Sequence, residues 1–200
     1  KPVDIYVHFY SAEKFAALAS LRKVYDWAHA QPLHPVFMGR YAASTRDFFA
    51  LRIDRTGPNR FLIEGGREVR TLRFDDPVGE PDMAGSRGVL GFKHELGSLF
   101  VHLDASESRE LVLSKNPPVR PRLELANFEV SEWLATPDRV RFLKSGWWVS
   151  EGVLAGMAPG RPYRVNGAGI ATTLTASADG RLRLIFPDSE SGSPPRELLI

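Results

Sequence analysis

The spacing of hydrophobic residues changes near residue 51, and that change constrains the fold more than any other feature of the sequence. Between residues 12 and 30 apolar side chains recur every three or four positions, as in an amphipathic helix. A second short helix is expected over residues 42–50, with Phe48 and Phe49 turned inward. After residue 51, short runs alternate between apolar and polar side chains, with turn residues between them. The sequence therefore predicts a helical start and an all-β remainder.

The alternating runs predict antiparallel strands packed as two sheets, the arrangement of a β-sandwich. Residues 76–91 are rich in Pro, Gly and Asp and predict a long irregular connection, and residues 114–121, with three prolines, predict a linker. The expected strands are 51–55, 61–64, 69–74, 99–103, 111–113, 122–125, 129–134, 140–143, 147–149, 163–165, 171–176 and 182–186, with residues 198–200 closing a last one.

The first fifty residues predict a different unit. Residues 3–10 alternate like a strand, Ser11 is a plausible N-cap for the helix over 12–30, and residues 33–38 read as a second strand. Two strands joined by one helix form a right-handed βαβ unit, which needs neighbouring strands to bury both faces. We therefore expect an α+β chain: a short β-α-β piece, the end of a β/α barrel, in residues 1–50, then a sandwich-like domain in 51–200. Because the chain opens on Lys1-Pro2 without an initiator Met, we expect further protein upstream.

Composition excludes several classes of function. The absence of cysteine excludes disulfides, Cys-ligated zinc and Cys nucleophiles. The net charge is only +2 and basic residues are dispersed, so no nucleic-acid partner is expected. No stretch approaches the roughly 18 apolar residues of a membrane span.

Two features carry possible chemistry. His8 lies near the C-terminal end of the first predicted strand, the edge where active-site groups gather in β/α barrels, although a packed structural histidine fits the same spacing. None of the five histidines has a metal-ligand spacing, so no cofactor is expected in this chain. In the pair Trp147-Trp148 one indole should enter the core, while the other can stack on a sugar ring or cover an interface.

The sequence resembles PelA-like proteins, bacterial periplasmic enzymes of Pel exopolysaccharide synthesis, in the last part of their deacetylase domain and in the β-rich region that follows. The resemblance rests on three strings near the start, Val3-Asp4-Ile5-Tyr6-Val7-His8-Phe9-Tyr10-Ser11, Val24-Tyr25-Asp26-Trp27-Ala28 and Gln31-Pro32-Leu33-His34-Pro35-Val36, and on later ones such as Arg70-Thr71-Leu72-Arg73 and Val101-His102-Leu103.

The resemblance implies a periplasmic or secreted, metal-dependent N-deacetylase of an amino-sugar polymer. A divalent metal such as zinc would be held by earlier barrel strands of the intact enzyme, and His8 would protonate the leaving amine. Tyr10 and Trp148 are the expected substrate-binding residues, and the expected partners are the polysaccharide and other biosynthesis or export proteins. The sequence departs from the family at Arg40, where relatives tend to carry an acid, and this puts activity of the parent enzyme in doubt.

Two other functions fit the same residues. The chain can be a non-catalytic carbohydrate-binding or adaptor module, to which the βαβ piece merely docks. It can also be a structural domain that binds a partner protein of an export complex.

In the intact enzyme, His8→Ala is expected to leave the melting temperature unchanged and to lower kcat about 100-fold or more, because a general acid for the leaving amine is lost. Thermal melting and deacetylation assays on the enzyme and the variant check this. Unchanged turnover would return His8 to a structural role.

Overall fold

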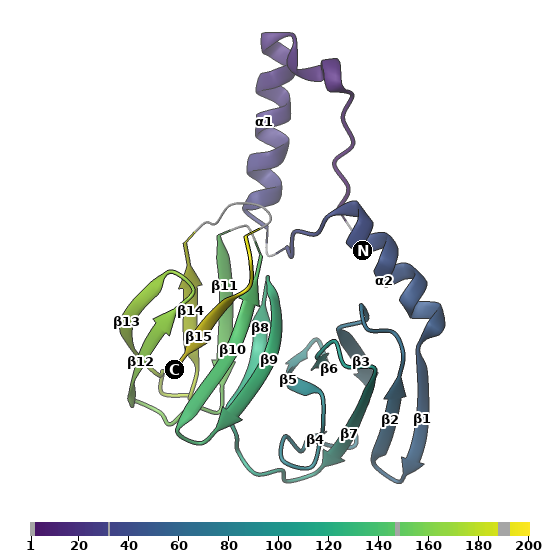
Figure 1. Cartoon of the computed structure of the whole chain (residues 1–200), viewed down its shortest axis with the longest axis vertical. Coiled ribbons are helices and arrows are strands. Elements are labelled where there is room, and N and C mark those ends of the chain that lie inside the picture. Colours follow the sequence, from purple (N-terminus) through teal and green to yellow (C-terminus); the bar gives the residue numbers. More distant parts are fainter. Residues whose placement is uncertain (1–2, 32, 147–148, 188–192) are drawn as a thin grey trace. The chain divides into compact units, whose positions relative to one another are not determined.

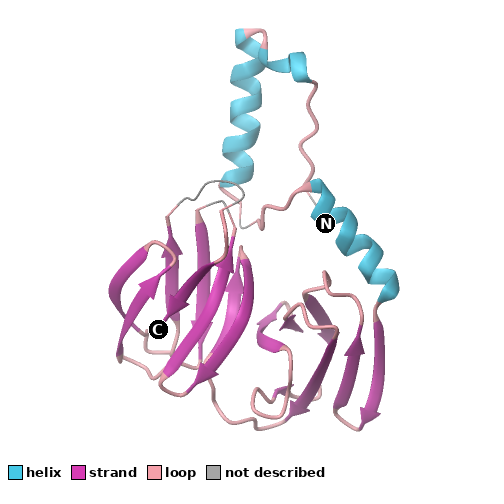
Figure 2. Ribbon diagram, in the orientation of Figure 1, coloured by secondary structure: helices cyan, strands magenta, loops and turns pink. Residues whose placement is uncertain are grey.

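A computed structural model describes residues 3–31, 33–146, 149–187 and 193–200 (Figure 1). The chain is α+β and mostly β, with its helices before residue 51 and its strands after it (Figure 2). This confirms the predicted change of character near residue 51. The chain forms two compact units, Lys1–His34 and Pro35–Ile200. Within the described residues, no helix combines the length and apolar character needed to cross a bilayer.

The first unit contains a 3-10 helix, η1 (Phe9–Ala12), and the helix α1 (Phe15–His29). The helix expected over residues 12–30 is therefore confirmed, but its N-cap is Lys14 rather than Ser11. The strand expected over residues 3–10 is wrong for this chain, because residues 3–8 pair with no described strand. A strand is stable only when a neighbour takes up its backbone hydrogen bonds.

The helix of the second unit is α2 (Met38–Ala50), which confirms the helix expected over residues 42–50 and begins four residues earlier. The strand expected over residues 33–38 is wrong, because residues 33–37 form no strand and Met38 belongs to α2. Phe48 and Phe49 are 63% and 82% exposed, so the prediction that they point inward is also wrong. The helix turns its polar face, not these two rings, toward the β region. Arg40 and Asp47, two turns apart, both bond the β region, and residues 48 and 49 then fall on other sides of the helix.

The first β half (residues 52–114) holds seven described strands around one core. The sheets have the orders β1-β2-β7-β4 and β3-β6-β5, and every pairing is antiparallel. Strand β4 and the first three residues of β5 lie in the segment expected to be irregular. The strands are β1 (Arg52–Gly57), β2 (Arg60–Glu64), β3 (Thr71–Asp75), β4 (Glu80–Pro81), β5 (Val89–Glu95), β6 (Ser98–Leu103) and β7 (Ser108–Ser114). The core contains Ile63, Phe92, Leu99, Val101, Leu103 and Leu111.

The second β half (residues 122–200) has its own core and two more antiparallel sheets, β13-β12-β15-β10-β9 and β14-β11-β8. The chain's last strand, β15, lies between β10 and β12. The strands are β8 (Arg122–Ala126), β9 (Glu129–Thr136), β10 (Arg139–Ser145), β11 (Ser150–Ala155), β12 (Pro162–Gly167), β13 (Ile170–Thr175), β14 (Leu182–Phe186) and β15 (Arg196–Leu199). In the described part of the chain, four sheets around two cores thus replace the two sheets expected from the sequence.

The two β halves meet where β5 approaches β8. Leu90 of β5 packs in the core of the second half, while Phe92 of the same strand packs in the core of the first. A Cβ at Gly91 would lie 2.0 Å from the Leu123 carbonyl oxygen, so only glycine allows this approach. Alongside it, the His102 Nε2 lies 3.0 Å from the Glu124 carbonyl oxygen. One strand is therefore shared between two cores.

Gly91→Ala should lower the free energy of unfolding by about 3 kcal/mol, because the added methyl group overlaps backbone atoms that cannot move aside locally. Gly39→Ala is the matched control: a Cβ there meets nothing within 4 Å, and alanine in a helix should raise stability by about 0.5–1 kcal/mol. Urea unfolding measures both. Equal effects of the two substitutions would contradict a tight β5–β8 contact.

Candidate functional site

The residues singled out near the N-terminus lie together as three exposed rings. The His8 imidazole stacks on the Tyr10 ring, with centroids 4.9 Å apart and planes at 7°, and meets the Tyr6 ring edge-on at 5.3 Å. Tyr6 and His8 belong to the segment that precedes η1, whereas Tyr10 lies within η1. Among the described residues, no group of three or more His, Asp or Glu side chains is arranged to hold a metal ion. The catalytic role of His8 and the substrate contact of Tyr10 stay predictions.

Trp147 and Trp148 lie outside the described residues. Their predicted division into one buried and one sugar-stacking indole is therefore not addressed by the structure. The strand expected over residues 147–149 falls mostly on these two residues, and the described strand that follows, β11, begins at Ser150.

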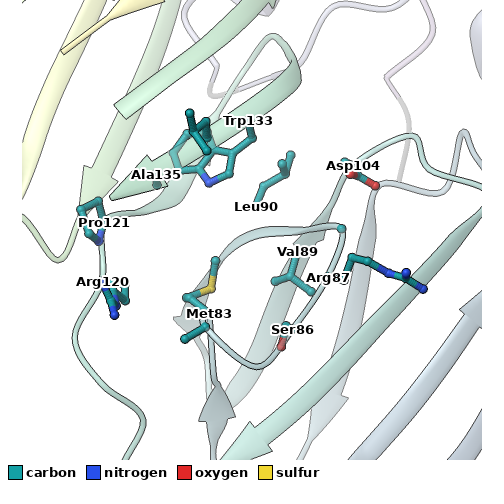
Figure 3. Close-up of a pocket in the computed structure, with 13 residues that line it drawn as sticks. Met83, Ser86, Arg87, Val89, Leu90, Asp104, Arg120, Pro121, Trp133 and Ala135 are labelled. Atoms are coloured by element: carbon teal, nitrogen blue, oxygen red, sulfur yellow. The ribbon is translucent and has the colours of Figure 1, made fainter. Parts of the chain in front are cut away.

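A cavity of about 320 Å³ lies between the two β halves, next to their contact (Figure 3). Strand β9 supplies one wall, and the loop that leads into β5 supplies the facing wall. The lining residues are Met83, Ala84, Ser86–Leu90, Asp104, Arg120, Pro121 and Trp133–Ala135. Ligand pockets in proteins commonly lie at such junctions and reach this size. This cavity is the candidate binding site.

A β-bulge aims Trp133 at the cavity. In the pairing of β9 with β10, Ser131 lies opposite Leu143 and Leu134 lies opposite Arg141, so Glu132 and Trp133 together face one residue. The Glu132 backbone has a φ of 50°, and this left-handed conformation accommodates the extra residue in the strand. The bulge reverses the alternation of the strand, so that Trp133 and Ala135 face inward while Leu134 is exposed.

One face of the Trp133 indole packs against another aromatic ring, whereas its N–H edge lacks a hydrogen-bond partner among the described residues. The ring stacks on Phe142 with centroids 5.7 Å apart and planes at 26°. Within the part of the chain that the structure describes, the indole Nε1–H has no hydrogen-bond acceptor. Figure 3 shows Leu90 and Met83 across the cavity from the indole. The cavity therefore offers an apolar wall together with one hydrogen-bond donor held in place by packing.

The facing loop is fixed by hydrogen bonds within itself and to β7. The Asp82 carboxylate accepts the backbone N–H groups of Ala84 and Gly85, at 3.0 and 3.2 Å. The Ser86 hydroxyl accepts the Val112 N–H at 3.0 Å. A cavity wall fixed in this way needs little reordering when a ligand binds.

Beneath the loop lies Arg109, whose side chain is fully buried. Its guanidinium donates to backbone carbonyls, including those of Gly65 and Asp104. Burial lowers the pKa of Arg109, and the negative charge of Asp104 opposes that shift. Burial likewise lowers the pKa of Arg70, which the charge of Asp104 also counteracts. Asp104, the one carboxylate among the described lining residues, thus has two cations behind it.

Arg40, the departure from the resembled family, fixes the start of β9. Its Nη2 lies 2.8 Å from a Glu68 carboxylate oxygen and 2.5 Å from a Glu129 carboxylate oxygen. Nearby, Arg70 Nη2 donates to the Val130 carbonyl at 2.9 Å. Arg40 therefore has a structural role here, tying α2 to the strand that carries Trp133.

Comparisons with known protein families, curated proteins and solved structures find no match to this chain.

Trp133 is not among the site residues expected from the sequence. Read as a regular strand, residues 129–134 place Val130, Glu132 and Leu134 on one face, so Trp133 shares the other face with Ser131. The bulge reverses this order beyond Glu132. A bulge formed by a non-glycine residue leaves no mark in the sequence pattern, so only the register of the two strands reveals it.

Arg40→Glu should destabilise the protein by about 1–2 kcal/mol, because it replaces two ion pairs with repulsion among three carboxylates. Arg40→Gln should cost less than half as much. Urea unfolding at low and high salt measures both, and about 1 M salt should remove most of the difference between the variants. A salt-independent difference would assign Arg40 a packing role instead.

Proposed function

We propose that this chain is the C-terminal part of a periplasmic polysaccharide deacetylase of exopolysaccharide and biofilm-matrix synthesis, and that its β region binds the polymer. The cavity beside Trp133 is the observation that carries the polymer-binding role. The deacetylase assignment rests on the resemblance of the N-terminal residues to PelA-like proteins.

The chemistry of the cavity suits a sugar ring. Aromatic side chains in a cavity present apolar area on which the C–H groups of a sugar pack, and a tryptophan adds an N–H that donates to a hydroxyl or carbonyl oxygen. The indole of Trp133 is held by Phe142, so it loses little freedom on binding. The cavity lies beside β9, the edge strand of its sheet, and a polymer can continue along that edge beyond one sugar residue.

The finer fold of the N-terminal residues belongs to the same proposal. We propose that residues 3–38 supply the last strand–helix–strand of a β/α barrel, with the other strands contributed by the intact enzyme. Several large apolar side chains of the first unit lack cover in this chain, as expected for a piece of a larger core. They include Tyr6, Phe9, Phe15 and Trp27, at 78%, 91%, 86% and 56% exposure. In that barrel His8 would act as the general acid beside a metal held elsewhere.

Binding at the cavity needs none of the chemistry of His8, so it is tested separately. Isothermal titration with soluble hexasaccharides, together with the NMR signal of the Trp133 indole N–H, measures it. Ala84→Trp should weaken binding by about tenfold or more, because a large side chain then fills the cavity while no core contact is lost. Trp133→Phe should weaken binding less, since it keeps the ring that stacks on Phe142.

The matched control is Trp27→Phe, which makes the same change at an exposed site in the first unit. It should leave the affinity unchanged. Hexasaccharide binding that survives Ala84→Trp intact would place any polymer site elsewhere and defeat the proposal for this cavity.

A further inference from the structure

Two arginines that line the cavity beside Trp133, Arg87 and Arg120, have no side-chain partner among the described residues. From this we infer that the saccharide it binds carries carboxylate groups, as a uronic acid does. The inference rests on the proposed function, that the cavity binds a glycan, and it adds the charge of that glycan.

Several exposed arginines lie against carboxylates: Arg60 with Glu110, Arg183 with Glu151, and Arg181 with Glu124. Others, such as Arg164, have no carboxylate partner among the described residues, so Arg87 and Arg120 are distinguished by their place at the cavity. In the part of the chain that the structure describes, the guanidinium groups of Arg87 and Arg120 make no ion pair and no hydrogen bond. Both residues line the cavity.

Asp104, the only carboxylate among the described residues that line the cavity, does not cancel this charge. Asp104 lies near Arg70 and the buried Arg109, and its charge counteracts the lowering of the pKa of both. One negative charge therefore faces two cations on its protein side. The charged residues that line the cavity are Arg87, Arg120 and Asp104, so the lining itself carries one more positive than negative charge.

The positions of the two arginines favour a chain over a single small anion. Arg120 precedes β8 and lies beside Pro121, whereas Arg87 belongs to the loop before β5. Figure 3 shows them on opposite sides of the cavity, with the Arg87 side chain extending away from its centre. Carboxylates repeated along a polymer can meet both, and a guanidinium binds a carboxylate with two parallel hydrogen bonds.

The same charge disfavours a cationic sugar. N-deacetylation turns a neutral amide into an ammonium group, which two unpaired guanidinium groups repel. A cavity of this kind therefore retains acidic segments of a polymer and releases deacetylated ones.

Three hexasaccharides test the inference on the full chain: oligogalacturonate, N-acetylglucosamine hexamer and glucosamine hexamer. At low salt, oligogalacturonate should bind about tenfold tighter than the neutral hexamer, and the cationic hexamer should bind weakest. Raising the salt to about 0.5 M should remove most of that preference, because exposed charges are screened.

Arg87→Gln and Arg120→Gln should each weaken oligogalacturonate binding about two- to fivefold, the usual scale of an exposed ion pair, and should leave the neutral hexamer unaffected. Arg164→Gln is the matched control, since Arg164 is exposed on β12, outside the cavity lining. It should change neither affinity.

The outcomes separate the two claims. If the neutral hexamer shifts the Trp133 indole signal and binds as tightly as oligogalacturonate, the cavity binds glycan but the charge inference is wrong. Tightest binding by the cationic hexamer has the same consequence. If none of the three hexasaccharides shifts the indole signal, the cavity is not a glycan site, and the inference falls with the proposed function.

Discussion

The approach of β5 to β8 at Gly91 is the contact on which the β region depends. Because no side chain separates the two backbones there, Leu90 and Phe92 can reach two different cores from one strand. The Arg122 guanidinium lies 4.2 Å above the Phe92 ring and adds a second tie across the same contact. The cavity lies beside this contact, so its shape depends on the same glycine.

The bulge in β9 places the Trp133 indole at this cavity and so makes the cavity a candidate binding site. Without the extra residue at Glu132, the alternation of β9 would turn Trp133 to the opposite face and Leu134 into its place. The strand that carries the bulge is anchored at its start by Arg40 and Arg70. Arg40 therefore has a physical explanation that does not involve catalysis, and an acid at this position would face two carboxylates.

The N-terminal residues and the β region differ in how completely they are folded. Each β half encloses a core of fully buried side chains, such as Leu103 in the first and Phe142 in the second. Within the first unit, Ala28 is the one described residue that is buried. A βαβ unit cannot bury both faces of its strands alone, and this is why the alternation of residues 3–10 produces no strand here. The proposed barrel would supply the missing neighbours.

The sequence alone determined the class of the chain and the place of most of its strands. The spacing of apolar residues changes at residue 51 from every three or four positions to every second position. This spacing determines which side chains share one face of a helix or strand, and it depends only on residues close together in the sequence. Tertiary structure decided the rest: the division into four sheets, the insertion of β15 between β10 and β12, and the inward turn of Trp133. Each of these depends on hydrogen bonds between residues far apart in the chain. A one-residue shift in such pairing reverses which side chains face the core, and local alternation does not reveal it.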